Sequence, residues 1–294
     1  MKIIDGKLIS DQIKSEIIVE VKKMIDNNID TPHLAAILVG EDGASQTYVA
    51  SKEKSSHEVG FTSTTYRFPE TISEKELLDA IDFINKDDEI DGLIVQLPLP
   101  KHISPDKVIN QIDPAKDVDG FHPQNIGKLV LGQETYVPAT PYGIMQMLTR
   151  SGIDTVGKNA VVIGRSNIVG TPMSILLSRN ANPGNCTVTM CHSKTENMKE
   201  IASKADILVV AIGKPEMIDS SYIKPGATVI DVGIHRIADE SKKSGFRLVG
   251  DVNYESASKV AGAITPVPGG VGPMTIVGLL QNTLIAKKKK LGLK

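Results

Sequence analysis

Residues 160–172 read A-V-V-I-G-R-S-N-I-V-G-T-P, and this stretch decides the fold that we expect. An apolar run ends at Gly164, and a polar loop with Gly170 precedes an apolar segment of helical periodicity. The pattern predicts a strand, a tight turn and a helix. In a parallel α/β sheet, such a turn presents free backbone N–H groups at a helix N-terminus, where the helix dipole favours an anion. The anion bound at such a turn is usually the pyrophosphate of a dinucleotide.

The spacing of this loop departs from the common dinucleotide fingerprint G-x-G-x-x-G. Ser166 stands at the position of the second glycine, and the last glycine, Gly170, comes one residue late. An ordinary strand-to-helix turn of any α/β protein therefore stays open as an alternative.

The composition is that of a globular protein with room for one large domain or two ordinary ones. The chain has 294 residues, of which 40% are hydrophobic and 23% are charged. A formal net charge of -2 gives no electrostatic basis for nucleic-acid binding, and no apolar run is long enough to span a membrane. Because residues 1–6 form no apolar leader, we expect a cytoplasmic protein.

The two cysteines, Cys186 and Cys191, are spaced for neither a C-x-x-C redox motif nor a zinc site. The six histidines are scattered without an H-x-x-x-H pair. We therefore predict no metal site and interpret both cysteines as small apolar core residues.

The first part of the chain predicts an α/β domain that spans residues 1–120. Hydrophobic periodicity and capping signals predict alternating elements, namely helix 8–27, strand 33–40, helix 44–59, strand 62–68, a helix from 73, strand 92–97 and helix 103–112. Such alternation is typical of a parallel sheet. The polar, turn-prone segment 113–120 forms a natural boundary.

Residues 121–294 predict a second α/β domain with a Rossmann-like, doubly wound parallel sheet. The expected elements after the opening stretch are strand 187–191, helix 196–204 and strands 207–212, 227–232 and 247–249. We expect the last helix, at about 275–294, to pack back on the first domain. Its terminal lysines, 287–290, suit the helix dipole and are expected to stay solvated. An active-site cleft is expected between the two domains.

The end of the second strand of this domain favours NADP over NAD. Dinucleotide sites usually place an acidic residue there to hold the ribose 2′-hydroxyl, whereas this chain has His192-Ser193-Lys194. Hydroxyl and cationic groups there, together with Arg165, suit a 2′-phosphate instead. A plain polar turn remains the alternative for residues 192–194.

Three polar positions in the first domain are candidates for chemistry. Tyr48 and Lys52 are four residues apart on a predicted helix, so they share one face. A lysine beside a phenol can act as an acid/base group, although the same spacing also marks solvated helix edges. Gln96 interrupts an apolar strand near its carboxyl end, where ligands bind in α/β sheets, and is either a structural bridge or a site residue.

Two aspartates, Asp117 and Asp119, lie in the boundary segment. A carboxylate there could accept hydrogen bonds from an amino-heterocycle. Turn formation is the alternative for both residues.

Together these motifs resemble the bifunctional methylenetetrahydrofolate dehydrogenase/methenyltetrahydrofolate cyclohydrolase family. They occur in the family's order and cover nearly the whole chain, namely Tyr48-x-x-x-Lys52, Val95-Gln96-Leu97-Pro98-Leu99-Pro100, Lys116-Asp117-Val118-Asp119-Gly120-Phe121, Gly164-Arg165-Ser166-x-Ile168-Val169-Gly170-x-Pro172, Cys191-His192-Ser193-Lys194-Thr195 and Pro266-Val267-Pro268-Gly269-Gly270-Val271-Gly272-Pro273-Met274-Thr275. The resemblance implies oxidation of 5,10-methylenetetrahydrofolate to the methenyl form with NADP, followed by hydrolysis to 10-formyltetrahydrofolate.

The resemblance also implies a role for each matched residue. Lys52 would be the central acid/base residue, Gln96 would hydrogen-bond and orient it, and Tyr48 would stack near the folate and help to place Lys52. Asp119 would hold the pterin ring. The loop that includes Pro266 and Gly270 would close over the folate. The NADP site would be lined by Gly164, Arg165, Ser166, Ser193 and Ile234, and the family suggests a homodimer formed through the second domain.

One position departs from the family pattern. Many members have a cysteine before the Thr-Pro that matches Thr140-Pro141, and this chain has Ala139. The departure weakens a catalytic role for that position and leaves Lys52 unaffected. Two other functions stay open, namely another NADP-linked dehydrogenase of a small amino or hydroxy acid, and a nucleotide-binding module without catalysis.

Overall fold

The computed structural model describes residues 1–242 and 245–293, which form two compact units. We call residues 11–139 and 276–294 the three-stranded unit, and residues 1–10 and 140–275 the six-stranded unit. Two helices, α1 (Gly6–Asp26) and α10 (Val271–Lys290), each contribute several residues to both units, and a third, α6 (Ala139–Arg150), contributes only its first residue, Ala139, to the three-stranded unit. Each unit is therefore built from segments that are far apart in the sequence.

The three-stranded unit contains a parallel sheet in the order β3-β2-β4. Its strands are β2 (His33–Val39), β3 (Thr62–Phe68) and β4 (Gly92–Val95). Ala36 at the centre of β2 lies opposite Thr65 of β3 and Ile94 of β4. Because β2 is covered on both faces, its apolar side chains run without the alternation of a half-exposed strand. The predicted strands of this region are confirmed.

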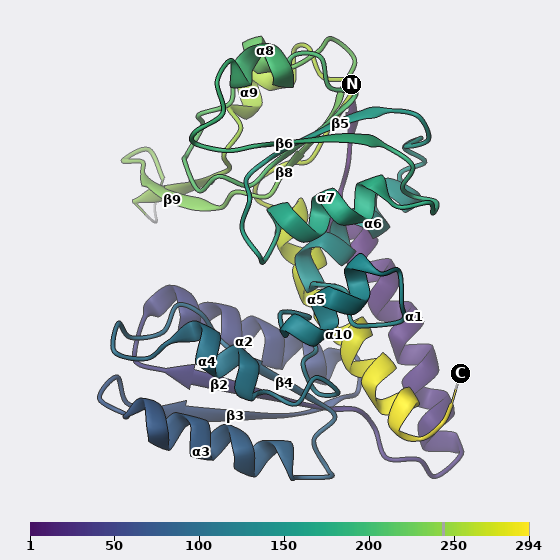
Figure 1. Ribbon diagram of the computed structural model, residues 1–294, viewed down its shortest axis with the longest axis vertical. Coiled ribbons are helices and arrows are strands. Elements are labelled where there is room, and N and C mark those ends of the chain that lie inside the picture. The colour runs from purple at the N-terminus through teal and green to yellow at the C-terminus, as the bar shows by residue number, and fades with distance from the viewer. Residues whose placement is uncertain (243–244, 294) are drawn as a thin grey trace. The chain divides into compact units, whose positions relative to one another are not determined.

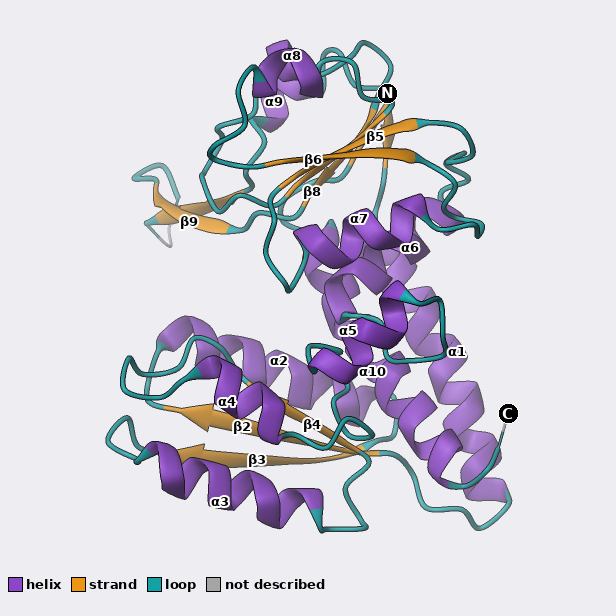
Figure 2. Ribbon diagram, in the orientation of Figure 1, coloured by secondary structure: helices purple, strands orange, loops and turns teal. Residues whose placement is uncertain are grey.

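Helices lie on both sides of this sheet (Figure 2). They include α2 (Gly43–Glu58) and α3 (Glu74–Asn85), with α4 (Pro105–Gln111) packed beside α3. Helix α5 (Pro123–Val130) follows in the same unit. Side chains at alternate positions of β2 point to opposite faces. Ala35 and Ile37 pack in one apolar cluster with Leu77 of α3, whereas Leu34 and Leu38 pack in another with Val49 of α2.

The start of α3 shows why the sequence begins a helix there. The Ser73 hydroxyl accepts a hydrogen bond from the Glu76 backbone N–H, and the Glu76 carboxylate accepts one from the Ser73 backbone N–H. This capping box satisfies two backbone donors that the first helical turn leaves without partners. The helix start expected at residue 73 is thereby confirmed.

Residues 121–139 belong with the three-stranded unit, although the sequence placed a boundary after Gly120. Asn125 on α5 donates hydrogen bonds to the Pro114 carbonyl and the Asp117 carboxylate. The Tyr136 hydroxyl donates to the Ala115 carbonyl at 2.8 Å. These contacts bind the segment back to residues 114–117, so the polar stretch near Gly120 is a turn within one unit.

The final helix also packs in the three-stranded unit. Asn282 donates to the carbonyls of Val118 and Val137, both at 2.8 Å. The terminal lysines differ from the solvated end that we expected. Lys287 is buried with its Nζ 3.4 Å from an Asp91 oxygen, and Lys288 donates to Glu20 at 2.7 Å.

The six-stranded unit contains a wholly parallel sheet in the order β1-β11-β8-β7-β5-β6. Its strands are β1 (Lys2–Ile3), β5 (Asn159–Ile163), β6 (Thr187–Cys191), β7 (Ile207–Val210), β8 (Thr228–Asp231) and β11 (Ala263–Ile264). Figure 1 labels three of these strands, β5, β6 and β8. The chain leaves β5 for β6 at the edge and then returns past β5 to β7. The strand order therefore reverses between β5 and β7, which is where doubly wound sheets bind ligands.

Further helices of this unit are α6 (Ala139–Arg150), α7 (Gly170–Ser178), α8 (Met198–Ala202) and α9 (Tyr254–Ala257), with a short helix η1 (Ser220–Tyr222). Figure 2 shows α8 and α9 on one side of the sheet and α6 and α7 on the other. Ala202 of α8 and Ala257 of α9 pack against Leu208 and Val229 of the sheet in one apolar cluster. The doubly wound arrangement is thus as predicted.

One predicted strand of this unit does not join the main sheet. The segment expected at 247–249 is β10 (Phe246–Val249), which pairs antiparallel with β9 (His235–Ala238) in a separate ribbon. The place beside β8 is instead taken by β11. Since β11 and β1 have two residues each, they carry too little sequence pattern to predict.

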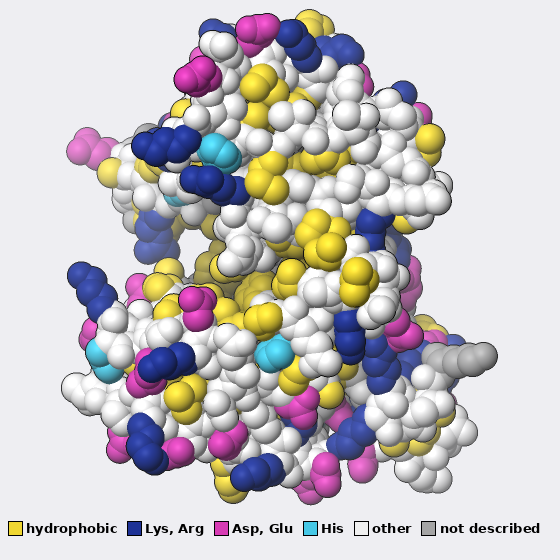
Figure 3. Space-filling model, viewed as in Figure 1, with side chains coloured by type: hydrophobic (Ala, Val, Ile, Leu, Met, Phe, Trp, Pro, Cys, Tyr) yellow, Lys and Arg dark blue, Asp and Glu magenta, His cyan; other side chains and the backbone are white. Residues whose placement is uncertain are grey.

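Within residues 1–242 and 245–293, every helix is too short or too polar to cross a membrane. Figure 3 shows cationic and anionic side chains interspersed over the drawn face of the three-stranded unit. This mixture agrees with a formal net charge of only -2.

Candidate active site

The structure brings Lys52 and Gln96 together in the three-stranded unit. Helix α2 starts at Gly43 and is capped by Asp42, whose carboxylate accepts a hydrogen bond from the Ser45 backbone N–H. Lys52 is 9% exposed, and its Nζ donates to Gln96 Oε1 at 3.1 Å. The Gln96 amide nitrogen in turn donates to the Leu97 carbonyl at 2.7 Å, which fixes the side-chain oxygen toward Lys52.

Asp119 contributes a carboxylate whose pKa is influenced by the charge of Lys52. The segment before it lies along β4, with Leu93 bridged to Asp117. Burial raises the pKa of the Asp119 carboxyl, and the Lys52 charge opposes this shift. No side chain or backbone group within the described residues donates a hydrogen bond to this carboxylate, which therefore keeps its accepting capacity for a ligand.

Asp117 differs from Asp119 in its surroundings. Its buried carboxylate accepts hydrogen bonds from the backbone N–H groups of Phe121 and His122 and from the Asn125 side chain, at 2.8–3.2 Å. Of the two alternatives for this residue, turn formation is therefore the one that the structure supports.

Tyr48 lies one helical turn before Lys52 on α2 and is 37% exposed. Burial of part of the ring raises the pKa of its phenol, so the hydroxyl stays protonated at neutral pH. The residue offers a neutral ring face and a hydroxyl beside the Lys52–Gln96 pair. It is suited to positioning a flat ligand, and not to accepting a proton.

The opening stretch forms the predicted loop between β5 and α7. Gly164 has φ +133°, and a Cβ on it would lie 2.3 Å from the Ala211 carbonyl oxygen after β7. A Cβ on Gly170 would lie 2.2 Å from the Gly164 carbonyl oxygen. Both positions therefore require glycine, because a side chain would collide with nearby backbone. Gly170, which comes one residue later than in the common fingerprint, is the first residue of α7.

Ser166 stands where the fingerprint has its second glycine, and its side chain makes hydrogen bonds that a glycine could not make. Its hydroxyl accepts hydrogen bonds from the backbone N–H groups of Val169 at 3.1 Å and Gly170 at 3.4 Å. Its carbonyl accepts one from the Thr171 N–H. The side chain therefore satisfies donors at the start of α7, as a helix cap does.

The turn after β6 lies at the same edge of the sheet. Ile163 and Cys191 are in register at the ends of β5 and β6, and Gly164 N–H donates to the Cys191 carbonyl at 2.8 Å. Thr195 Oγ1 accepts from the His192 N–H and thereby closes the turn. Ser193 is exposed in this turn, and Arg165 is exposed in the neighbouring loop.

Ile234 lies in the loop after β8, at the same edge, and is 46% exposed. The loop is tightly packed, because a Cβ on Gly233 would lie 2.4 Å from the Asp251 backbone nitrogen. Farther along, a Cβ on Gly270 would lie 2.4 Å from the Pro266 carbonyl oxygen. The segment that carries Pro266 and Gly270 is thus folded closely on itself.

Two buried aspartates of this edge were missed by the sequence analysis. Asp231 ends β8 and Asp251 follows β10. Burial raises the pKa of the Asp231 carboxyl to about 6, although three backbone N–H groups donate to it. The available signal was an aspartate at the end of each apolar run, in V-I-D-V-G and V-G-D-V.

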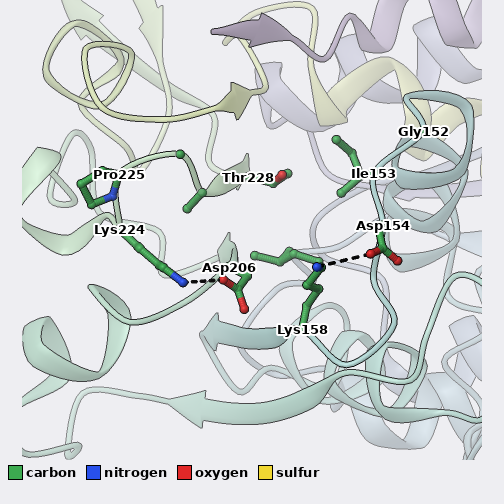
Figure 4. Close-up of a pocket in the computed structure, with 11 residues that line it drawn as sticks. Gly152, Ile153, Asp154, Lys158, Asp206, Lys224, Pro225 and Thr228 are labelled. Atoms are coloured by element: carbon green, nitrogen blue, oxygen red, sulfur yellow. Dashed lines mark hydrogen bonds and ion pairs between the residues drawn. The ribbon is translucent and has the colours of Figure 1, made fainter.

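Two cavities lie in the six-stranded unit. One of about 500 Å³ is lined by residues that include Asp231, Val252 and Pro266, near the carboxyl ends of the strands. Another of about 380 Å³ lies at the opposite edge, where β5, β7 and β8 begin (Figure 4). Its lysines, Lys158 and Lys224, pair with Asp154 at 3.3 Å and Asp206 at 2.7 Å. These cations are neutralised within the protein and lie away from the glycine loop.

Both cysteines are free and buried, as predicted. Burial raises the pKa of the Cys186 thiol to about 11 and also raises the pKa of the Cys191 thiol. The thiols therefore stay protonated and act as core side chains.

Comparison with known proteins matches two family models to the chain. Residues 4–119 match the catalytic domain of tetrahydrofolate dehydrogenase/cyclohydrolase, and residues 138–291 match its NAD(P)-binding domain. The fold and these matches define an α/β enzyme with a catalytic domain and a nicotinamide-dinucleotide-binding domain. The chain belongs to the tetrahydrofolate dehydrogenase/cyclohydrolase family.

Individual relatives cover nearly the whole chain. The bifunctional protein FolD of Cytophaga hutchinsonii is 58% identical over 290 residues, which are 99% of this chain and 100% of the relative. The crystal structure of the bifunctional methylenetetrahydrofolate dehydrogenase/cyclohydrolase from Campylobacter jejuni has 45% identity and a TM-score of 0.92, covering 99% of each chain. The Trypanosoma brucei enzyme, solved with NADP and an inhibitor, has 38% identity and a TM-score of 0.92, covering 98% of each chain.

Proposed function

We propose that this chain oxidises 5,10-methylenetetrahydrofolate to the methenyl form with NADP and hydrolyses that product to 10-formyltetrahydrofolate. As a member of its family, the chain is a bifunctional dehydrogenase and cyclohydrolase of methylenetetrahydrofolate. The observation that carries the assignment of the chemistry is the hydrogen bond between Lys52 Nζ and Gln96 Oε1 in the catalytic domain.

The cofactor would be held at the carboxyl edge of the six-stranded sheet. The close approaches at Gly164 and Gly170 fix the path of the loop between β5 and α7, which is where doubly wound sheets hold a dinucleotide pyrophosphate. Arg165 and Ser193 are exposed there, and no acidic residue occurs in residues 187–195. These features support contact with a 2′-phosphate. When bound, NADP supplies a hydride acceptor for the methylene carbon of the folate.

The folate would be bound by Asp119 and Tyr48 of the three-stranded unit. The Asp119 carboxylate is not committed to a partner within the described residues, so it can accept hydrogen bonds from the pterin amino group and ring nitrogen. The partly exposed Tyr48 ring offers a face for stacking. Asp119 therefore sets the orientation of the pterin, while Tyr48 limits its position.

Lys52 would serve the proton transfers of hydrolysis. The methenyl group is a cation, so water adds at its carbon, and the adduct then opens with proton movement between oxygen and nitrogen. A buried amine held by Gln96 is positioned to relay these protons. Hydride transfer itself moves no proton and depends mainly on placement. The same lysine is therefore needed more by the second reaction than by the first.

The test supplies methylenetetrahydrofolate with NADP and records NADPH and the methenyl intermediate by absorbance. We expect NADPH to form, with the methenyl intermediate turning over to 10-formyltetrahydrofolate. Turnover with small amino or hydroxy acids in place of the folate, or NADP binding without turnover, would contradict the proposal. Parallel kinetics with NAD test the cofactor, because equal or better activity with NAD would overturn the preference for NADP.

We also propose that the protein acts as a cytoplasmic homodimer, formed through the NAD(P)-binding domain. This proposal rests on the family resemblance. Light scattering of the purified protein is expected to give twice the mass of one chain. A monomer at enzymatic concentrations would contradict it.

A further inference from the structure

Two buried aspartates at the carboxyl edge of the six-stranded sheet interlock the loops that follow its strands. Asp231 is 3% exposed and Asp251 is 0% exposed. Neither residue belongs to the loop that carries Gly164 or to the turn that carries Ser193. Carboxylates are seldom buried so completely without a specific set of partners.

The Asp251 carboxylate accepts four hydrogen bonds. Its Oδ2 accepts from the backbone N–H groups of Ile212 at 2.8 Å and Gly213 at 3.1 Å. Its Oδ1 accepts from the Lys214 N–H at 2.8 Å and lies 2.8 Å from His235 Nε2. One side chain thus holds the loop that follows β7 and the strand β9 that follows β8.

The Asp231 carboxylate makes the reciprocal contacts. It accepts hydrogen bonds from the backbone N–H groups of Gly233, Asp251 and Val252 at 2.9–3.0 Å. A Cβ on Gly250 would lie 1.8 Å from Asp231 Oδ2. Asp231, at the end of β8, therefore hydrogen-bonds the segment that carries Asp251. Asp251 in turn hydrogen-bonds the loop after β7 and the start of β9.

These loops adjoin the proposed cofactor site at the Gly164 loop. Ala211, directly before the Asp251-bound amides, has its carbonyl oxygen 2.3 Å from the position of a Cβ on Gly164. The Ala211 N–H donates to the Ile163 carbonyl at 2.8 Å, which joins the loop to the end of β5. Ile234 lies between Gly233 and His235, both of which contact this carboxylate network.

We propose that Asp251 is a positioning residue for the dinucleotide, which sets the loops after β7 and β8 against the Gly164 loop. The inference rests on the proposed function, because it assigns Asp251 to the same cofactor site. A carboxylate is required because an amide has one accepting oxygen. With asparagine at this position, an NH₂ group would face N–H donors, and at least one backbone amide would lose its acceptor.

The test compares Asp251→Asn with Asp206→Asn. Asp206 is a matched control because it also accepts a backbone N–H, from Asn159, but lies at the opposite edge of the same sheet (Figure 4). We expect Asp251→Asn to raise the KM and the Kd for NADP about tenfold. Hydrolysis of supplied methenyltetrahydrofolate, which needs no nucleotide, should keep its kcat and KM. Asp206→Asn should leave NADP affinity unchanged.

A milder variant keeps the proposal testable if Asp251→Asn does not fold. His235→Gln alters one donor to Asp251 at a partly exposed position, and we expect its KM for NADP to rise about threefold with unchanged hydrolysis. Unchanged NADP affinity in the soluble variants, or an equal loss in Asp206→Asn, would overturn the role of Asp251. A wild-type protein that does not oxidise methylenetetrahydrofolate with NADP would instead overturn the proposed function.

Discussion

The two units of this chain build their sites from different parts of the polypeptide. In the three-stranded unit the candidate groups are side chains, namely Lys52, Gln96 and Asp119. In the six-stranded unit they lie on a loop whose backbone path depends on Gly164 and Gly170, where segments approach closely. The difference teaches that proton chemistry needs a particular functional group, whereas binding of a phosphate chain needs a particular backbone path.

The largest expected effect comes from removing the amine of the first site. We predict that Lys52→Met lowers cyclohydrolase turnover about 10³-fold, because the proton relay is lost. Dehydrogenase activity should be retained in part, since hydride transfer depends on placement. The two rates are measured separately by supplying methenyltetrahydrofolate or methylenetetrahydrofolate with NADP.

The control for this variant is Lys54→Met on the same helix. The Lys54 side chain is 79% exposed and lies 3.9 Å from Glu58, so its loss should leave both activities near wild type. Cyclohydrolase turnover close to wild type in Lys52→Met would refute the assigned role.

A smaller effect is expected from disrupting a close backbone contact in the loop of the second site. In Gly170→Ala, the new methyl group would lie 2.2 Å from the Gly164 carbonyl oxygen, so the loop or the start of α7 must shift. We predict about a 100-fold rise in the KM for NADP and a loss of about 1–3 kcal/mol in the free energy of unfolding. Steady-state kinetics and urea titration measure these quantities.

The same substitution should spare hydrolysis of supplied methenyltetrahydrofolate, because Lys52 and Gln96 are in the other unit. Gly127→Ala on α5, where a methyl group meets open space, serves as the control. If Gly170→Ala bound NADP as tightly as the wild type, the backbone origin of the second site would be wrong.

The next effect separates two neighbouring aspartates. We predict that Asp119→Ala raises the KM for the folate about tenfold, because a charge-assisted hydrogen bond to the pterin is lost. Asp117→Asn should instead lower the free energy of unfolding by about 1–3 kcal/mol, since its carboxylate holds backbone donors. Folate binding followed by fluorescence, together with urea titration, distinguishes the two. Unchanged folate affinity in Asp119→Ala would count against the pterin contact.

The smallest effect concerns the ion pairs of α10. Hydrogen bonds from Lys23 and Lys288 lower the pKa of Glu20 to about 2. Because the folded-state pKa lies below the ordinary value of 4.5, this interaction stabilises the fold above about pH 4.5 and is lost as the pH falls toward 2. Glu20 is 32% exposed, so Glu20→Gln should cost only about 0.5–1 kcal/mol at pH 7.

Urea titration at pH 7 and at pH 3 measures that difference, which should shrink at the lower pH. The more exposed pair Lys75–Asp79 supplies a control, and Asp79→Asn should change the free energy of unfolding less than Glu20→Gln does. A loss that is equal at both pH values would show that Glu20 contributes through packing and not through charge.

The sequence predicted the elements that depend on local pattern. The strand before Gly164, the capping box at Ser73 and the helix that carries Lys52 all follow from nearby residues. The Lys52–Gln96 hydrogen bond was expected from the family resemblance, because a spacing of 44 residues gives no physical guide. The roles assigned to these residues stay predictions.

The remainder depends on contacts that no local pattern records. Asp231 and Asp251 are held by backbone N–H groups of separate segments. Because nearly every residue carries a backbone N–H group, residue types do not reveal such contacts. Strands β1 and β11 have two residues each, and their pairing joins Lys2 to Ala263. The position of residues 121–139 depends likewise on Asn125 and Tyr136 and not on composition.

The packing of α10 has a consequence for the order in which the protein can fold during synthesis. Leu279 and Ala286 complete the same apolar cluster as Leu34 and Leu38 of β2. A ribosome makes β2 early and must then make residues 140–275 before it reaches these partners. One face of the nascent sheet, which α2 covers in part, therefore lacks its contacts with α10 through most of translation.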